Sequence, residues 1–325
     1  MSKLTSPNRI AFVHIGTHKT GTTSLQAMLG KNESPFRNAG VFIPKAGRIE
    51  HNSAAHHNVA WELGRDKRFD PRLGTFEALL QEAAAVDATN ICLTSEDFEL
   101  LHGNLAALQG LRDGLLSIGY TPAIVLYLRP QVEYLESLYA EIIKLWDIGF
   151  AEYIETVLSD GAWRTSLFEY DQLAGAFANV FGRDKLIVRA YRSSSPSAAL
   201  LREFAGTIAP ALPLNRLSLP GRLNPMAVFP DIIAARERQL TCSAHHKMSA
   251  KQRFDPLSLL DIIRITVRFS RANERIACMY GAKIGCVTQT TLAREIMTVI
   301  LKDRNSRHRK QLIRALAEDA TEIAA

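Results

Sequence analysis

A short segment near the start of the chain combines two glycines, one lysine and a run of hydroxyl side chains in an order typical of a phosphate-binding loop. The apolar residues 10–15 predict a buried strand, and residues 16–21 predict a loop bounded by glycines. A helix is predicted next, and its first turn contains Thr22, Thr23 and Ser24. Because the first N–H groups of a helix are unpaired and its dipole is positive there, an anion is the expected ligand.

The lysine of this loop is displaced from the position it takes in ATP-binding loops. Gly16 and Gly21 have the spacing of an ATP-binding P-loop, but Thr22 stands where the lysine should follow the second glycine. The only lysine of the loop is Lys19, which would approach the terminal anionic group from a different side. Since the P-loop lysine and the hydroxyl that holds magnesium must follow the second glycine, this arrangement argues against an ATPase or kinase.

A second candidate anion site follows another predicted strand. The six apolar residues 123–128 predict a buried strand that ends at Arg129, and Pro130 suits the first turn of the next helix. In a parallel sheet, ligands bind beyond the carboxyl ends of the strands, which places Arg129 at the ligand edge. Ser137 follows eight residues later, two turns into the predicted helix. Taken singly, Arg129 could be a surface charge and Ser137 a tolerated helix residue.

Together these segments resemble the sulfotransferases that use 3′-phosphoadenylyl sulfate (PAPS). Their 5′-phosphosulfate loop has the form Lys-[Ser/Thr]-Gly-Thr-[Thr/Ser], and this chain has Lys19-Thr20-Gly21-Thr22-Thr23. Their 3′-phosphate site has an Arg at a strand end and a Ser eight residues on, which Arg129 and Ser137 match. Weaker landmarks that are similar to the bacterial branch of this superfamily extend the resemblance over roughly residues 8–208.

The resemblance implies a P-loop-like α/β fold and direct in-line transfer of a sulfuryl group from PAPS to an acceptor hydroxyl or amine, leaving adenosine 3′,5′-bisphosphate. The expected acceptor is a carbohydrate or glycolipid, and the scheme requires no metal. Lys19 would stabilise charge on the bridging oxygen. The expected nucleotide-binding residues are Lys19, Thr20, Gly21, Thr22, Thr23, Ser24, Arg129, Ser137 and, by a looser match, Tyr191.

Two residue types could supply the base that removes the acceptor proton, because related enzymes use either His or Glu. His56 and His57 form an adjacent pair in a string that resembles a landmark of the bacterial branch, and an ordinary histidine titrates near neutrality. Glu96 follows the predicted strand 91–94 at the ligand edge, where it could act as the base or orient a histidine. Each of the three could instead be a helix-start or surface residue.

Strands alternate with helices along the first two thirds of the chain, which predicts a parallel sheet covered on both faces. We expect an α/β core over residues 1–208 and a mainly helical extension over 209–325 packed on the same domain. The predicted strands cover residues 10–15, 41–43, 90–94, 123–129 and 186–191. The predicted helices cover residues 22–37, 75–85, 104–117, 131–146, 150–158, 168–181 and 196–206, with a further segment at 269–281. A His-rich loop is predicted to enter a helix within residues 51–63.

Composition and charge favour a cytoplasmic enzyme that binds polyanions. The net charge is +6, which suits a nucleotide with several phosphates. The longest apolar run is about six residues, against the roughly 20 that span a bilayer, and the four cysteines show no metal-ligand spacing. The densest basic run, 302–314, has no interleaved aromatic residues, so we expect no nucleic-acid partner. A solvated helix face is the favoured reading of this run, and peripheral membrane contact is the alternative.

Two other functional classes are also compatible with the sequence. In a nucleotide-dependent kinase or ATPase, the segment 91–97 would be the hydrophobic strand that ends in a metal-binding acid. In a non-catalytic module, the same loop would bind the nucleotide for sensing or scaffolding, although a lysine retained in the loop disfavours this class.

Overall fold

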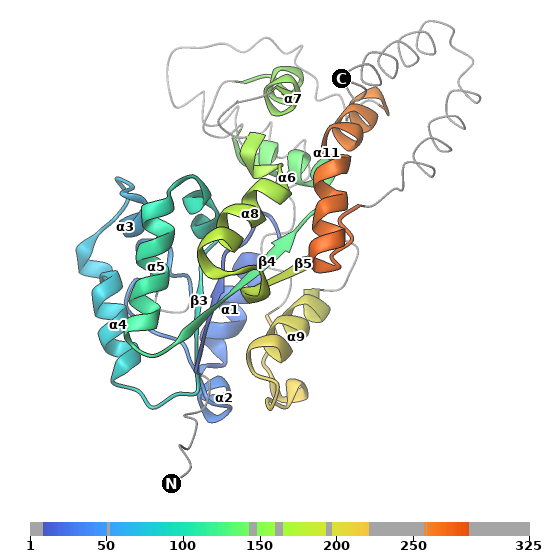
Figure 1. Ribbon diagram of the computed structural model, residues 1–325. Coiled ribbons are helices and arrows are strands. Elements are labelled where there is room, and N and C mark those ends of the chain that lie inside the picture. Colours follow the sequence, from blue (N-terminus) through green and yellow to red (C-terminus); the bar gives the residue numbers. More distant parts are fainter. Residues whose placement is uncertain are drawn as a thin grey trace, which may run out of the picture.

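A single sheet of five parallel strands forms the centre of the molecule, as the sequence predicts (Figure 1). The computed structural model describes residues 9–50, 53–142, 148–159, 165–192, 197–220, 257 and 259–285. The strands are β1 (Ile10–His14), β2 (Val41–Phe42), β3 (Asn90–Thr94), β4 (Thr121–Leu128) and β5 (Leu186–Ala190). Their order across the sheet is β2-β3-β1-β4-β5.

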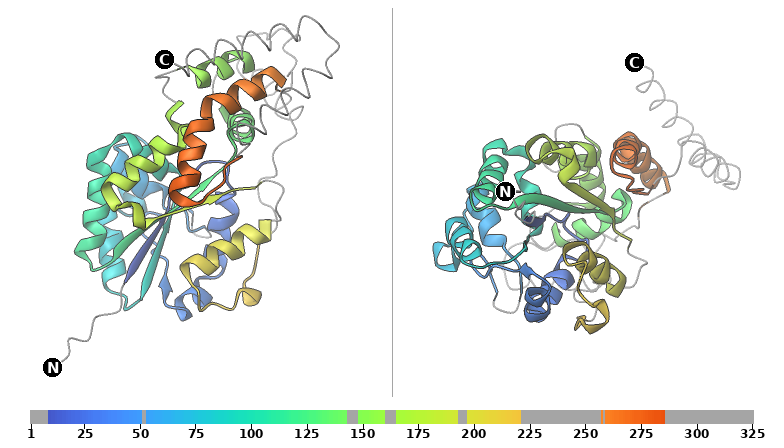
Figure 2. Two further views of the ribbon diagram at one scale, coloured as in Figure 1. Left: turned by 45° about the vertical axis from the view of Figure 1, so that its right-hand side comes forward. Right: turned by 60° about the horizontal axis from the view of Figure 1, so that its bottom comes forward.

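Helices cover both faces of this sheet (Figure 2). They are α1 (Thr22–Lys31), α2 (Glu33–Asn38), α3 (His57–Gly64), α4 (Phe76–Ala84), α5 (Leu105–Ser117), α6 (Gln131–Ile142), α7 (Phe150–Leu158), α8 (Tyr170–Phe181), α9 (Ser197–Ile208) and α11 (Leu259–Tyr280). Successive side chains of a strand point to opposite faces, so Ala11 and Val13 join one apolar cluster and Phe12 joins the other. The first cluster lies under α4, α5 and α8, and the second lies under α1, α2 and α9.

The helix predicted over residues 22–37 is in fact two helices that meet at Asn32. The side-chain amide of Asn32 donates to the carbonyl of Met28 at 2.7 Å and to that of Ser218 at 2.9 Å. Its side-chain oxygen accepts the N–H of Ser218 at 2.8 Å. An asparagine whose side chain binds nearby backbone competes with helical hydrogen bonding, which explains the break.

The C-terminal region contributes a long helix, α11, that packs against α6 and α8 (Figures 1 and 2). Asn273 on α11 and Gln131 on α6 exchange two buried side-chain hydrogen bonds, both of 2.9 Å. Ile276 joins the apolar cluster beside α8. The helix predicted at 269–281 is therefore present, whereas the boundary at residue 208 and the packing of the whole segment 209–325 stay predictions.

None of the described helices is long and apolar enough to cross a bilayer. The basic run 302–314 lies outside the described residues.

Candidate functional site

The carboxyl ends of four strands meet at one edge of the sheet. His14 pairs with Thr94 of β3 and with Val125 of β4, while Leu128 pairs with Ala190 of β5. The arrowhead of β4 points toward this edge, beside α6 (Figure 1). All predicted site residues follow these strand ends or lie on the helices beside them, as expected for an open parallel sheet.

The predicted phosphate loop is held between β1 and β4. The N–H of Thr17 donates to the carbonyl of Tyr127 at 2.8 Å, and the N–H of Tyr127 donates to the carbonyl of Gly16 at 2.7 Å. Lys19 and Gly21 both have positive φ, at 62° and 81°, which turns the chain tightly before α1. At Gly21 a side chain would also meet Leu200, since an added Cβ would lie 2.8 Å from its Cδ2 atom.

The start of α1 presents donors that have no partner among the described residues. Gly21 caps the helix through its carbonyl, which accepts the N–H groups of Ser24 and Leu25 at 3.1 Å. The N–H groups of Lys19, Gly21 and Thr22 donate to no described residue, and the buried Oγ1 atom of Thr22 has no hydrogen-bond partner there either. Buried donors normally have a partner, so this loop fits an anion such as a phosphate.

Arg129 links this loop to α6 and to the end of β5. Its side chain is buried, and it donates to the carbonyl of Lys19 at 3.2 Å and to Glu133 at 3.3 Å. Its guanidinium lies over the ring of Tyr191, 5.6 Å from the centroid. The ammonium of Lys19 lies 2.8 Å from a carboxylate oxygen of Glu141, also on α6. Lys19, Arg129 and Tyr191 are therefore brought together from three separate segments.

The other predicted nucleotide-binding residues lie on the same loop and helices. Thr20 is buried and donates its hydroxyl to the carbonyl of Thr17 at 2.6 Å. Thr23 is exposed, whereas Ser24 is buried in the first turn of α1. Ser137 is buried two turns along α6 from the strand end that carries Arg129.

His56 is a buried structural histidine. Its Nε2 atom lies 2.9 Å from the carbonyl of Pro44, and its Nδ1 atom accepts the N–H of Thr94 at 3.2 Å. Burial, followed by the nearby charge of Arg48, lowers the pKa of His56 to about 3. Because both ring nitrogens are engaged and the residue has no exposed surface, the structure favours His57 and Glu96 over His56 as the base.

His57 and Glu96, the two other candidate bases, are neighbours. The Nε2 atom of His57 lies 3.7 Å from a carboxylate oxygen of Glu96, and its Nδ1 atom lies 2.8 Å from the Ser95 hydroxyl. The imidazole stacks on Trp61 with centroids 5.9 Å apart. Gln26 of α1 donates to the same Glu96 carboxylate at 2.9 Å. Both candidate bases therefore lie beside the phosphate loop, and both side chains are partly accessible, at 12% and 19%.

Sequence reasoning missed a charged cluster that joins the loop to the segment after β3. The ring of His18 makes a short hydrogen bond to Glu99, and its other nitrogen lies 3.4 Å from Asp97. Although burial opposes protonation, Glu99 and then Asp97 raise the pKa of His18 well above its ordinary value. The available signals were a histidine inside the loop and three acids among residues 96–99.

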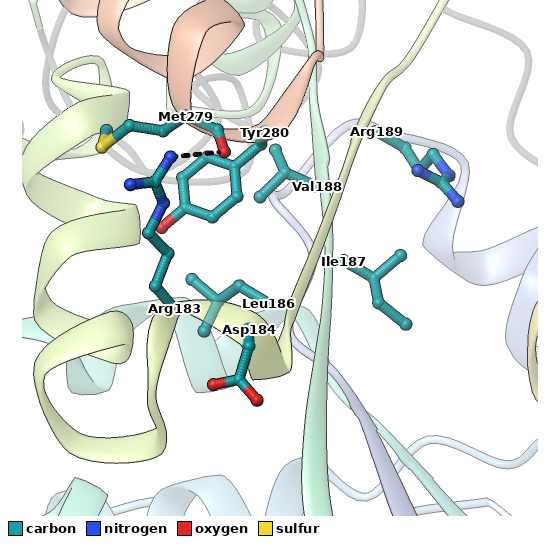
Figure 3. A pocket seen from close by; sticks show the side chains of 8 residues that line it. All are labelled: Arg183, Asp184, Leu186, Ile187, Val188, Arg189, Met279 and Tyr280. Carbon is teal, nitrogen blue, oxygen red and sulfur yellow. Dashed lines mark hydrogen bonds between the residues drawn. The ribbon is translucent and has the colours of Figure 1, made fainter.

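A separate pocket lies away from these residues, between β5, the turn at Arg183–Lys185 and the end of α11 (Figure 3). Its volume is about 620 Å³, and Arg183 crosses it to donate to the carbonyl of Met279 at 2.9 Å. None of the predicted site residues lines it. In the described part of the chain, no three His, Cys, Asp or Glu side chains are grouped as a metal site would need.

Comparisons with known proteins give one structural likeness to report. No family model matches the sequence, and no curated protein matches it. Among solved structures, the chain is similar to a sulfotransferase from Alicyclobacillus acidocaldarius, at 13% identity and with a TM-score of 0.46. The alignment covers 86% of this chain and 98% of that chain.

Proposed function

We propose that the protein is a sulfotransferase that transfers a sulfuryl group from PAPS to an acceptor hydroxyl or amine, with a carbohydrate or glycolipid as the expected acceptor. One observation carries the proposal: a phosphosulfate-type loop, Lys19-Thr20-Gly21-Thr22-Thr23, lies in direct contact with Arg129. In the resemblance noted from the sequence, these two elements hold the 5′- and 3′-phosphates of one nucleotide.

The loop supports this proposal through its donors. The N–H groups of Lys19, Gly21 and Thr22 and the buried hydroxyl of Thr22, which have no partner among the described residues, would hold the 5′-phosphate. Arg129 would pair with the 3′-phosphate, because a guanidinium forms strong charge-assisted hydrogen bonds to phosphate. Tyr191 is in contact with Arg129 and would lie beside the same nucleotide.

Catalysis would consist of positioning, charge stabilisation and one proton transfer. The Nε2 atom of His57 would accept the proton of the acceptor hydroxyl while a new bond forms between the acceptor oxygen and sulfur. As the bond between sulfur and the leaving phosphate oxygen breaks, Lys19 would stabilise the charge that develops on that oxygen. Glu96, 3.7 Å from the same Nε2 atom of His57, would help to orient the imidazole.

The same geometry bears on the alternatives. In an ATPase or kinase, a lysine would lie after the second glycine, where this chain has the buried Thr22. A non-catalytic nucleotide-binding module would not need a histidine and a carboxylate side by side at the loop. The cytoplasmic location, the lack of a nucleic-acid partner, the lack of a required metal and the identity of the acceptor stay predictions.

Lys19→Ala tests the catalytic part of the proposal. We expect kcat for sulfuryl transfer to fall by about tenfold to a hundredfold, or about 1.4 to 2.7 kcal/mol, because the lysine charge is needed most in the transition state. The affinity for adenosine 3′,5′-bisphosphate, measured by calorimetry, should change by less than about threefold.

Lys31→Ala is the matched control, since Lys31 is exposed at the far end of the same helix. It should leave kcat and the affinity for adenosine 3′,5′-bisphosphate unchanged. A loss of affinity with unchanged turnover of the bound complex in Lys19→Ala would contradict a catalytic role for the lysine.

A further inference from the structure

Asp97 collects donors from several separate segments of the chain. Its Oδ1 atom lies 3.4 Å from Nε2 of His18 in the phosphate loop. Its Oδ2 atom accepts the indole N–H of Trp61 at 2.7 Å and lies 3.5 Å from both His57 Nδ1 and Arg68 Nη1. The side chain is only 9% exposed. A buried carboxylate with donors on both oxygens is held in one orientation, so Asp97 is a fixed point between the loop and α3.

The two oxygens of Asp97 face different histidines, and each histidine is held a second time. The backbone N–H and the ring of His18 both bind the same oxygen of Glu99. The His57 ring stacks on Trp61 at an interplanar angle of 17°. Asp97 therefore links the loop that carries Lys19, which directly follows His18, to the His57 ring.

Asp97 also bears on which nitrogen of His57 carries the proton. The Nδ1 atom of His57 lies between the Ser95 hydroxyl, at 2.8 Å, and the Asp97 carboxylate, at 3.5 Å. The Ser95 oxygen already accepts the N–H of Asp97 at 3.1 Å. A carboxylate beside one imidazole nitrogen favours the tautomer with the proton on that nitrogen. The Nε2 atom also has a carboxylate neighbour, Glu96, but at the longer distance of 3.7 Å and through an oxygen that already accepts the Gln26 amide at 2.9 Å. The Asp97 side therefore favours a proton on Nδ1 and leaves Nε2 as the proton acceptor.

We infer that Asp97 is a positioning residue that keeps the His57 proton on Nδ1 and, through His18, holds the lysine-bearing loop at a set distance from the base. The catalytic part of this inference rests on the proposed function. The charges around Asp97 also favour its role. Burial opposes ionisation of Asp97, yet His18, and then His57 and Arg68, lower its pKa to about 2, so the carboxylate is charged at neutral pH.

Asp97→Asn in the full-length protein tests this inference, with the tautomer of His57 read from long-range ¹H–¹⁵N spectra of ¹⁵N-histidine-labelled protein. The His57→Gln variant assigns the signals. Wild type should show the proton on Nδ1, and Asp97→Asn should move the population toward the Nε2-protonated form. In a sulfuryl-transfer assay, kcat should fall by about tenfold to a hundredfold with nucleotide affinity within about threefold.

Asp66→Asn is the matched control, because Asp66 pairs with the same Arg68 but contacts neither histidine. It should leave the His57 signals unchanged. An unchanged tautomer in folded Asp97→Asn would overturn the inference. A wild-type spectrum with the proton on Nε2 would also overturn it, even if the variant does not fold. The spectra need no substrate, so they test Asp97 even if the protein proves to have no transferase activity.

Discussion

Replacement of Arg129 by alanine is expected to weaken binding of adenosine 3′,5′-bisphosphate by roughly 30-fold to 1000-fold, or about 2 to 4 kcal/mol. The expected loss is large because the side chain is only 10% exposed, so its hydrogen bonds to a phosphate would be poorly screened by water. Isothermal titration calorimetry with purified protein measures the change directly.

Two companion variants separate a binding role of Arg129 from a structural one. Arg189→Ala removes an exposed arginine from the adjacent strand β5 and should leave the affinity unchanged. Arg129→Lys keeps the charge without the planar fork, so it should recover part of the affinity. If Arg129→Ala remains folded and binds the nucleotide as tightly as wild type, Arg129 does not hold the 3′-phosphate.

Replacement of His57 by alanine is expected to lower turnover by roughly 10²-fold or more, because general-base catalysis contributes on this scale. The affinity for adenosine 3′,5′-bisphosphate should stay within about threefold, since the imidazole lies beside Glu96 and Ser95 and contacts no residue proposed to hold the nucleotide. Turnover is measured by steady-state transfer from PAPS, and the nucleotide affinity is measured by calorimetry.

Glu96→Gln in the same assay decides between the two neighbouring groups. If His57 is the base and Glu96 only orients it, Glu96→Gln should retain more activity than His57→Ala. His102→Ala is the control, because that ring binds only the backbone carbonyl of Glu99 among the described residues. Full activity in His57→Ala together with an inactive Glu96→Gln would make the carboxylate the base.

The strand and loop pattern could be predicted because it depends on local chemistry. Apolar runs that end at Gly16 and Arg129 predict strands whose carboxyl ends share one edge, and the structure has them there. The break at Asn32 could not be predicted from apolar periodicity, because it depends on which backbone groups the Asn32 side chain binds, among them Ser218, 186 residues away. A helix propensity carries no information about such a partner.

The roles of adjacent histidines also depend on tertiary contacts. His56 and His57 are equivalent in type and differ by one position, but His56 is enclosed by Pro44 and Thr94 while His57 faces Glu96. His18 is similar, since its partner Glu99 lies 81 residues further along the chain. Residue type therefore identified the candidates, and only the packing around each ring distinguishes a core histidine from one that faces the candidate site.

Thermal stabilisation of the full-length protein by adenosine 3′,5′-bisphosphate in the presence of EDTA tests the proposed nucleotide site directly. Adenosine 5′-monophosphate, ATP with magnesium and GTP with magnesium serve as comparisons, the last two in buffer without EDTA. Because binding to the native state raises the melting temperature, the bisphosphate should give the largest shift. The 5′-monophosphate should give a smaller one, since it lacks the phosphate assigned to Arg129. Stabilisation by magnesium-ATP or magnesium-GTP with none by the bisphosphate would show that the site does not hold a 3′,5′-bisphosphate.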